Sequence, residues 1–223
     1  MEQPDRYRTG DQALVRQMNL SAVMHHLLEF APISRAMLAE RTGLNKTTVS
    51  SLVRELLTYN FVREVGIESA GTGRPGVLLE FNPGAGCIVS AELGVDFISV
   101  IRANFAAEIQ WRRHEATDPA LGQAAILDRT IALLHEASDT SQDGCSGLFG
   151  LALGVPGLVN VERGELLFAP NLGWRDVPLG AMLRDEFNAM VHVSNEANLA
   201  ALGEYFFGAA RGHEEVLYIS AGV

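Results

Sequence analysis

The sequence has two cysteines, one lysine and no apolar run long enough to cross a membrane. Cys87 and Cys145 have neither the density of a disulfide-stabilised domain nor the spacing of zinc ligands. The longest uncharged apolar run, residues 147–159, is short and contains glycine and proline. The first twelve residues are polar and mixed in charge, unlike a secretory leader. We therefore expect a cytoplasmic protein with no membrane partner, in which both cysteines act as small apolar side chains.

Charge is distributed unevenly along the 223 residues, of which 48% are hydrophobic, as in an ordinary globular chain of one or two domains. The formal net charge is −10. Residues 1–83 carry 9 basic and 9 acidic side chains, whereas residues 84–223 carry 8 basic and 18 acidic ones. Because DNA repels an acidic surface, any contact with DNA is expected from the first part. Within it, residues 35–74 have six basic and four acidic side chains.

Residues 1–83 have the periodicity of three helices and two strands. Ser34 and Asn45 are expected to cap the second and third helices, and Gly43 to end the second. The predicted helices are 13–30, 35–41 and 46–59, and the predicted strands are 61–65 and 77–81. In the first helix, the apolar residues Leu14, Met18, Val23, Leu27 and Leu28 recur at helical spacing.

The second and third helices have the spacing of a helix-turn-helix. Ala39 is small where two helices cross, Gly43 suits the turn, and Leu44, Val49 and Leu52 fill the space between the helices. Short hydroxyl groups and cations on the other face suit phosphates and base edges in a major groove. The residues expected to bind DNA are Arg35, Asn45, Lys46, Thr47, Thr48, Ser50, Ser51 and Arg54. The alternative is an ordinary helical hairpin with a solvated polar face.

The loop between the two predicted strands adds to the case for DNA binding. Its residues 71–76 read Gly-Thr-Gly-Arg-Pro-Gly, which presents Arg74 on a tip that is flexed by Gly73 and stiffened by Pro75. An arginine on such a tip suits a narrow minor groove. The loop alone could be a surface turn, but with the helices it predicts a winged helix-turn-helix over residues 1–83.

Residues 84–223 have the pattern of an α/β domain, in which strands alternate with helices. The predicted strands are 87–92, 97–104, 109–114, 149–155, 191–194 and 216–220, and the predicted helices are 119–137 and 196–207. The first three strands are expected to form a meander. Because the sequence ends directly after a hydrophobic strand, we expect the domain to be incomplete.

Several short motifs in a fixed order make the chain similar to the ROK (repressor, open reading frame, kinase) family, and specifically to its xylose-repressor-like regulators. The motifs are Ile33-Ser34-Arg35, Thr42-Gly43-Leu44, Gly73-Arg74-Pro75, Gly154-Val155-Pro156-Gly157, residues 169–174, Asn195-Glu196-Ala197-Asn198, residues 200–204 and Leu217-Tyr218-Ile219-Ser220. The resemblance implies a winged helix-turn-helix followed by an actin-like (sugar-kinase, ribonuclease-H-like) α/β domain that binds a sugar between two lobes.

The resemblance also implies a sugar site. Carried over by position, Gly157, Asn171, Asn195 and Glu196 would line it, and a carboxylate with side-chain amides can satisfy hydroxyl groups that both donate and accept. Asn171 and Asn195 could instead only cap turns or helices. For Trp174 we expect core packing rather than ligand contact.

Two departures from the family's kinases disfavour catalysis. Glu196 stands where those kinases have an aspartate as general base, which displaces the carboxylate by about one carbon–carbon bond. In the stretch that resembles their phosphate loop, Val95 replaces a glycine and Asp96 replaces a hydroxyl residue. The family's zinc motif would lie beyond Val223, so no cofactor or metal site is expected in this chain.

The sequence thus predicts a non-enzymatic, sugar-responsive transcriptional regulator, a repressor that binds a double-stranded DNA operator as a homodimer and a small sugar as its effector. One alternative is an ATP-dependent sugar kinase with an added DNA-binding head. Another is a decayed fragment that binds DNA constitutively.

Overall fold

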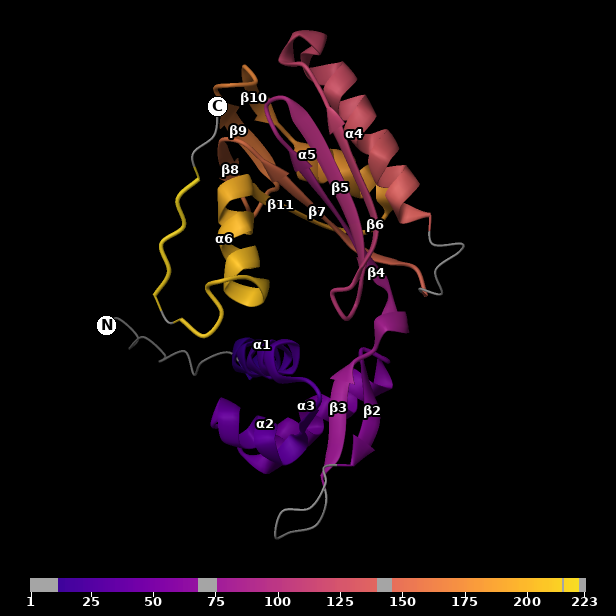
Figure 1. Ribbon diagram of the computed structural model, residues 1–223, viewed down its shortest axis with the longest axis vertical. Coiled ribbons are helices and arrows are strands. Elements are labelled where there is room, and N and C mark those ends of the chain that lie inside the picture. The colour runs from indigo at the N-terminus through magenta and orange to yellow at the C-terminus, as the bar shows by residue number, and fades with distance from the viewer. Residues whose placement is uncertain (1–11, 68–75, 140–145, 214, 221–223) are drawn as a thin grey trace, which may run out of the picture. The chain divides into compact units, whose positions relative to one another are not determined.

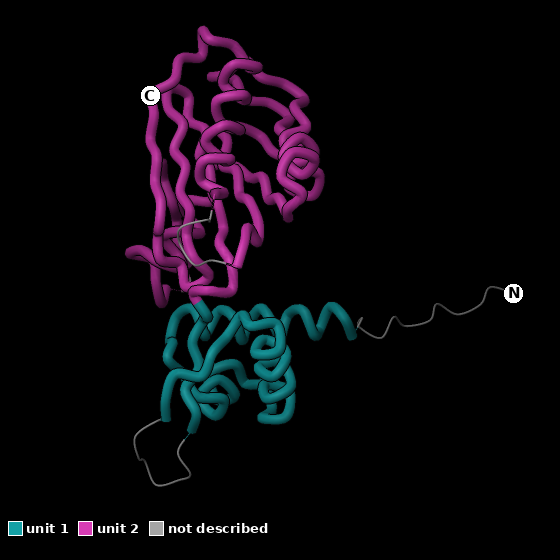
Figure 2. Tube along the Cα trace, turned by 90° about the vertical axis from the view of Figure 1, so that its right-hand side faces the viewer, with its two compact units in different colours: residues 1–82 teal, residues 83–223 magenta. Residues whose placement is uncertain are grey.

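The computed structural model describes residues 12–67, 76–139, 146–213 and 215–220, and divides the chain into two compact units. Figure 2 shows unit 1, residues 1–82, and unit 2, residues 83–223, in different colours. No helix among the described residues is long and apolar enough to cross a membrane.

Unit 1 contains three helices, α1 (Gln12–Phe30), α2 (Arg35–Thr42) and α3 (Lys46–Thr58). The predicted caps are present. The Ser34 side chain accepts a hydrogen bond from the N–H of Met37, and Asn45 accepts one from the N–H of Thr48. Gly43 has φ 69°, the left-handed conformation that ends α2 and turns the chain into α3.

The sheet of unit 1 has one strand more than predicted. β2 (Val62–Ile67) and β3 (Val77–Phe81) form the expected antiparallel pair, and β1 (Ile33–Ser34) joins the other edge of β3. A strand of two residues is too short to show alternation in a sequence. Only the tertiary fold, which brings β1 beside β3, reveals it.

Helix α1 buries less of its apolar face than its spacing predicts. Val23 and Leu27 are fully buried, whereas Leu14 is 55% exposed and Met18 is 63% exposed. A helix of 19 residues is about 28 Å long at 1.5 Å per residue. The second half of α1 therefore supplies its buried residues, and the first half remains exposed.

Unit 2 is built on a mixed five-stranded sheet with the order β11-β7-β4-β5-β6 (Figure 1). Its strands are β4 (Cys87–Leu93), β5 (Phe97–Asn104), β6 (Ile109–Ala116), β7 (Leu148–Val155) and β11 (Met190–Asn195). The predicted meander β4-β5-β6 is antiparallel, whereas β4, β7 and β11 run parallel to one another. The sheet therefore places the carboxyl ends of three strands at one edge.

Helices cover the two faces of this sheet. Alternate residues of β4, β5 and β7 pack with α4 (Gly122–Ser138) and α5 (Leu179–Phe187) in one core. The intervening residue Gly154 faces α6 (Glu196–Phe207), where Leu199 is its nearest side chain. Short 3₁₀ turns at Pro83–Ala85 and Pro119–Leu121 precede β4 and α4.

A second sheet in unit 2 was not predicted. It contains β8 (Leu158–Asn160), β9 (Glu165–Ala169) and β10 (Trp174–Val177) in the order β10-β9-β8. Trp174 is 4% exposed and belongs to the core, as predicted. The strands have three to five residues each, so their periodicity is too brief to identify them from sequence.

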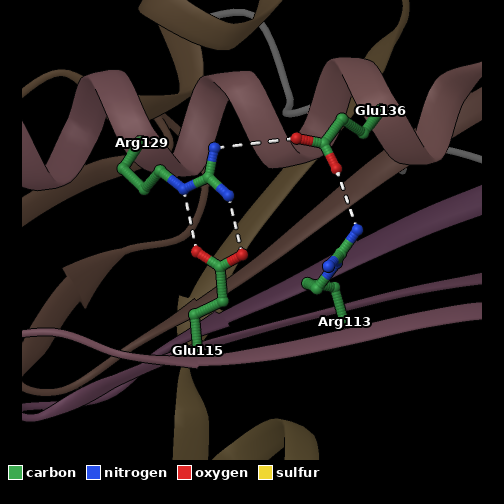
Figure 3. Close-up of polar contacts among 4 residues, drawn as sticks. All are labelled: Arg113, Glu115, Arg129 and Glu136. Carbon is green, nitrogen blue, oxygen red and sulfur yellow. Dashed lines mark hydrogen bonds and ion pairs between the residues drawn. The ribbon is translucent and has the colours of Figure 1, made fainter.

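The exposed surface of α4 is joined to the edge strand β6 by ion pairs. Arg129 donates two hydrogen bonds to Glu115, at 2.8 and 2.6 Å, and also lies 3.6 Å from Glu136 (Figure 3). Glu136 in turn accepts from Arg113 at 3.5 Å. The hydrogen bond from Arg129 lowers the pKa of Glu115. These exposed charges link two elements whose docking depends mainly on the apolar residues beneath.

One predicted strand is wrong. Residues 216–220 form no strand in the structure, and Leu217 and Ile219 are 85% and 79% exposed. The segment has the composition of a strand, but a strand also needs a neighbour to receive its backbone hydrogen bonds. Among the described residues, no strand lies beside it.

Candidate nucleic-acid interface and ligand site

Helix α3 separates an apolar face from a polar one. Its buried residues are Val49, Leu52, Val53 and Leu56. Lys46, Thr47, Ser51 and Arg54 are exposed, and Thr48 and Ser50 are half-buried. Residues 47, 51 and 54 are spaced by four and three positions, so they share one face of the helix. The structure thus places three of the predicted DNA-binding residues, Thr47, Ser51 and Arg54, on one exposed face of α3.

The acidic side chains of unit 1 are largely paired. Arg16 contacts Glu55, Arg35 lies 3.0 Å from Glu64, and Arg63 lies 2.6 Å from Glu80. Within the described part of the chain, Lys46 and Arg54 form no ion pair. Their charges are therefore available to an anionic partner, whereas that of Arg35 is shared with Glu64.

One of the predicted DNA-binding residues also has a structural role. Asn45 uses its side-chain oxygen to cap α3, at 2.7 Å from the N–H of Thr48. Gly73 and Arg74, which form the predicted wing tip, lie outside the described residues.

The predicted sugar-site residue Asn195 lies at the carboxyl ends of the parallel strands of unit 2, beside residues that the sequence analysis did not assign to the site. Asn195 ends β11, Gly154 lies near the end of β7, and Glu92 lies near the end of β4, paired with Gly154. In open α/β sheets, ligands bind at this edge. Glu196 follows Asn195 directly as the first residue of α6.

Gly157 is held tightly beside Asn195. Its carbonyl oxygen accepts a hydrogen bond from Asn195 Nδ2 at 3.0 Å. Its φ is 114°, and a Cβ there would collide with the carbonyl oxygen of Phe168 and lie 2.8 Å from Cα of Ala169. Glycine is therefore required at this close approach of the β7–β8 turn to β9.

Asn171 lies two residues beyond Ala169, in the turn that joins β9 to β10. The turn is closed by hydrogen bonds from the N–H of Leu172 to Ala169 and from the N–H of Gly173 to Pro170, both 3.2 Å. Asn171 is exposed. The structure therefore places Asn195 in contact with both Gly157 and Glu196, and places Asn171 in the turn between β9 and β10.

The Glu196 carboxyl has an altered acidity. Burial raises its pKa above the ordinary value, and the nearby carboxylate of Glu92 raises it further, while a hydrogen bond from its own backbone N–H acts in the opposite direction. The sequence analysis did not assign Glu92 to this site. Glu92, near the end of β4, and Glu196, directly after β11, come near each other only through the parallel pairing of the sheet.

The turn after β4 has no open glycine-rich loop. The N–H of Gly94 donates to the carbonyl of Phe97 at 2.8 Å, and a Cβ at Gly94 would overlap the Phe97 ring. That ring also stacks on His114, with 5.1 Å between ring centroids. An aromatic ring thus lies directly against the Gly94 backbone.

Among the described residues, the cysteine and the acidic side chains form no candidate metal site. No group of three or more His, Cys, Asp or Glu side chains there could hold a metal ion. Cys87 is a buried thiol at the start of β4. Cys145 lies outside the described residues.

The model of the ROK family matches residues 88–223, which is more than half of the chain. The chain belongs to the ROK family. It is also 39% identical to a putative xylose repressor of Caldicellulosiruptor sp. (strain Rt8B.4) over 214 residues, which are 96% of this chain and 54% of that protein. The chain therefore spans about half the length of the curated ROK relatives it matches.

Two solved ROK structures have the same fold. A ROK transcriptional regulator described as a homologue of the E. coli MLC protein matches 86% of this chain and 49% of its own, with a TM-score of 0.69 and 25% identity. A ROK glucokinase from Streptomyces griseus matches 58% of this chain and 39% of its own, with a TM-score of 0.51 and 31% identity. The fold of unit 2 is thus that of the actin-like sugar kinases and regulators of the family.

Proposed function

We propose that this ROK chain is part of a cytoplasmic, sugar-responsive transcriptional repressor of genes for sugar metabolism. The observation that carries the proposal is the extent of the similarity. The match to the xylose repressor covers 96% of the chain and thus extends over both units. The match to the glucokinase structure covers 58%, which is no more than the length of unit 2.

In this proposal, unit 1 is a winged helix-turn-helix that binds a double-stranded operator. Helix α3 lies in the major groove, where Lys46, Thr47, Ser51 and Arg54 contact phosphates and base edges. Arg35, Asn45, Thr48 and Ser50 flank that surface, and Gly73 and Arg74 reach the minor groove. Two copies of the chain read the two halves of the operator as a homodimer.

Unit 2 supplies the effector site in this proposal. Gly157, Asn171, Asn195 and Glu196 surround the position of a small sugar at the carboxyl edge of the sheet. Sugar binding favours one arrangement of the protein and so changes the spacing of the two DNA-binding units. Xylose is the first candidate, because the relatives that match both units at 34–39% identity are named xylose repressors, whereas those named N-acetylglucosamine repressors match at 22%.

We further propose that the chain has no kinase activity. Support comes from Glu196 in place of the kinase aspartate and from the Phe97 ring against Gly94, in the stretch that resembles the kinases' phosphate loop. The alternative, a sugar kinase with an added DNA-binding unit, predicts ATP-dependent phosphorylation of a hexose.

The test is fluorescence anisotropy with labelled DNA from upstream of the protein's own gene, at several salt concentrations, with and without xylose, glucose and N-acetylated sugars. Lys46→Ala and Arg54→Ala should each weaken binding and reduce the slope of log K against log salt by about 1. Arg163→Ala removes the same charge from an exposed residue of unit 2 and serves as the matched control. Its binding curve should coincide with that of the wild type.

Two results would contradict the proposal. Equal losses in Arg163→Ala and Arg54→Ala would mean that binding reflects overall charge rather than the α3 surface. Turnover of ATP in the presence of a sugar that does not alter DNA binding would favour the kinase.

A further inference from the structure

An ion pair joins the start of α2 to the strand β2 in unit 1. Arg35 Nη2 donates a hydrogen bond to Glu64 Oε1 at 3.0 Å, although the two residues are 29 positions apart in the chain. The side chain of Arg35 is 32% exposed and that of Glu64 is 48% exposed, so both reach the surface of the unit. Arg35 is also the first residue of the first helix of the helix-turn-helix.

The sheet of unit 1 explains why these two side chains meet. In the register of the sheet, Leu79 of the central strand β3 lies between Ile33 of β1 and Glu64 of β2. Residues directly opposite each other in an antiparallel pair point to the same face, so Glu64 shares the face of the buried Leu79 and Ile33. Arg35 follows β1 directly and comes within reach of Glu64 across that face.

A second ion pair of β2 lies on the opposite face. Arg63 donates to Glu80 Oε1 from Nε at 2.8 Å and from Nη2 at 2.6 Å, and the two residues are partners in the register of β2 and β3. Successive residues of a strand point to opposite faces, so Arg63 points away from the face that carries Glu64. The two pairs therefore have the same charges and differ in the face they occupy.

We propose that Glu64 competes with DNA phosphates for Arg35, so that β2 holds this arginine in the free chain and a phosphate replaces Glu64 in the complex. This role of Glu64 rests on the proposed DNA-binding function of unit 1 and describes how that binding is limited. The first helix of a helix-turn-helix crosses the DNA backbone, and Arg35 is the first residue of that helix. A phosphate is therefore the DNA group that Arg35 meets.

The exchange of partners follows from the exposure of the pair. An exposed ion pair contributes little to stability, because water screens both charges. A phosphate offers the guanidinium two acceptor oxygens, and its binding releases counterions from the DNA. Glu64 then has no partner and lies near the phosphates. It thus lowers the affinity twice, because it stabilises the free chain and repels DNA in the complex.

The test is a double-mutant cycle of Arg35→Gln and Glu64→Gln, measured by fluorescence anisotropy. The two probes are DNA from upstream of the protein's own gene and unrelated DNA of equal length. Glu64→Gln should bind both about fivefold more tightly at low salt, the scale of one exposed ion pair. The slope of log K against log salt should become steeper by about 1. The gain should be equal for the two DNAs, because phosphates carry no sequence information.

Glu80→Gln is the matched control, because it removes the same charge from the neighbouring ion pair of the same sheet. Its gain in affinity should be smaller than that of Glu64→Gln, since it acts only through the overall charge. In the Arg35→Gln background, the gain from Glu64→Gln should fall to that of the control. All these variants should melt close to the wild type, because each loses only an exposed pair. Glu64→Ala gives the same comparison if the glutamine variant fails to fold.

Two results would overturn this role of Glu64. One is an equal gain in Glu64→Gln and Glu80→Gln, and the other is a gain from Glu64→Gln that is undiminished in the absence of Arg35. A wild-type chain with equal affinity for the two DNAs would instead overturn the proposed function. The cycle on unrelated DNA would still decide the role of Glu64, so the two failures appear in different measurements.

Discussion

Two asparagine side chains each cap a helix, one in each unit. Asn45 begins α3 and Asn195 begins α6, and each accepts a hydrogen bond from a backbone N–H group of the first turn. Both caps follow from sequence because asparagine before an apolar periodic segment is a typical helix start. The additional donation from Asn195 to Gly157 does not follow from sequence, because 38 residues separate the partners.

Removal of the α3 cap should destabilise the protein. Asn45→Ala leaves the N–H of Thr48 without its partner and should lower the free energy of unfolding by about 1 kcal/mol. Urea denaturation monitored by circular dichroism measures the change. Asn45→Ser keeps a capping oxygen and should retain most of the stability. An alanine variant as stable as the serine variant would contradict a role for this cap.

The raised pKa of Glu196 predicts a pH-dependent stability. The folded state holds the proton more tightly than the unfolded state, so this group favours folding at acid pH and loses that contribution as the pH rises through the raised pKa. Glu196→Gln, which stays neutral, should therefore have a higher melting temperature than the wild type at pH 8. The difference should shrink as the pH falls through that pKa. A difference that is constant with pH would contradict this account.

At the scale of elements, the second unit depends on close approaches between strands and turns. Gly157 lies against β9 with φ 114°, whereas Gly203 lies within α6 and has nothing within 4 Å of a Cβ position. The two glycines look alike in sequence. Their surroundings in the fold make one of them indispensable and the other replaceable.

Alanine at the two positions should have opposite effects. Gly157→Ala should destabilise the protein by more than about 1 kcal/mol, because the methyl group meets the backbone of Phe168 and Ala169. Gly203→Ala should raise the free energy of unfolding by about 0.5–1 kcal/mol through helix propensity. Thermal and urea unfolding of the two variants measure both effects. Stabilisation by Gly157→Ala would contradict the close approach at β9.

At the scale of the whole molecule, the two compact units differ in net charge. Residues 1–82 have equal numbers of acidic and basic side chains, and the entire net charge of −10 belongs to residues 83–223. Unit 1 has its own buried side chains, among them Val23, Leu38 and Leu52. Its 82 residues exceed the size below which a domain usually needs a disulfide or a metal to fold.

We therefore predict that residues 1–82 fold as an isolated fragment. Its amide NMR spectrum should be dispersed, and its unfolding should be cooperative. At low salt the fragment should bind non-specific DNA more tightly than the 223-residue chain, because the repulsion from the acidic unit is gone. An undispersed spectrum would contradict the independence of unit 1. Equal DNA affinities would contradict the electrostatic reason.

The sequence by itself determined the helices with strong periodicity, their caps, the β4-β5-β6 meander and the family. These features depend on neighbours within a few residues, or on motifs whose order is visible in the sequence alone. The tertiary structure alone decided the two-residue strand β1, the sheet β8-β9-β10, the exposure of Leu14 and Met18, and the absence of a strand at residues 216–220. It also decided that Glu92 lies near Glu196 and that Gly157 is bound to Asn195. Each of these depends on a partner distant in the chain, and local propensity carries no information about which partner a segment meets.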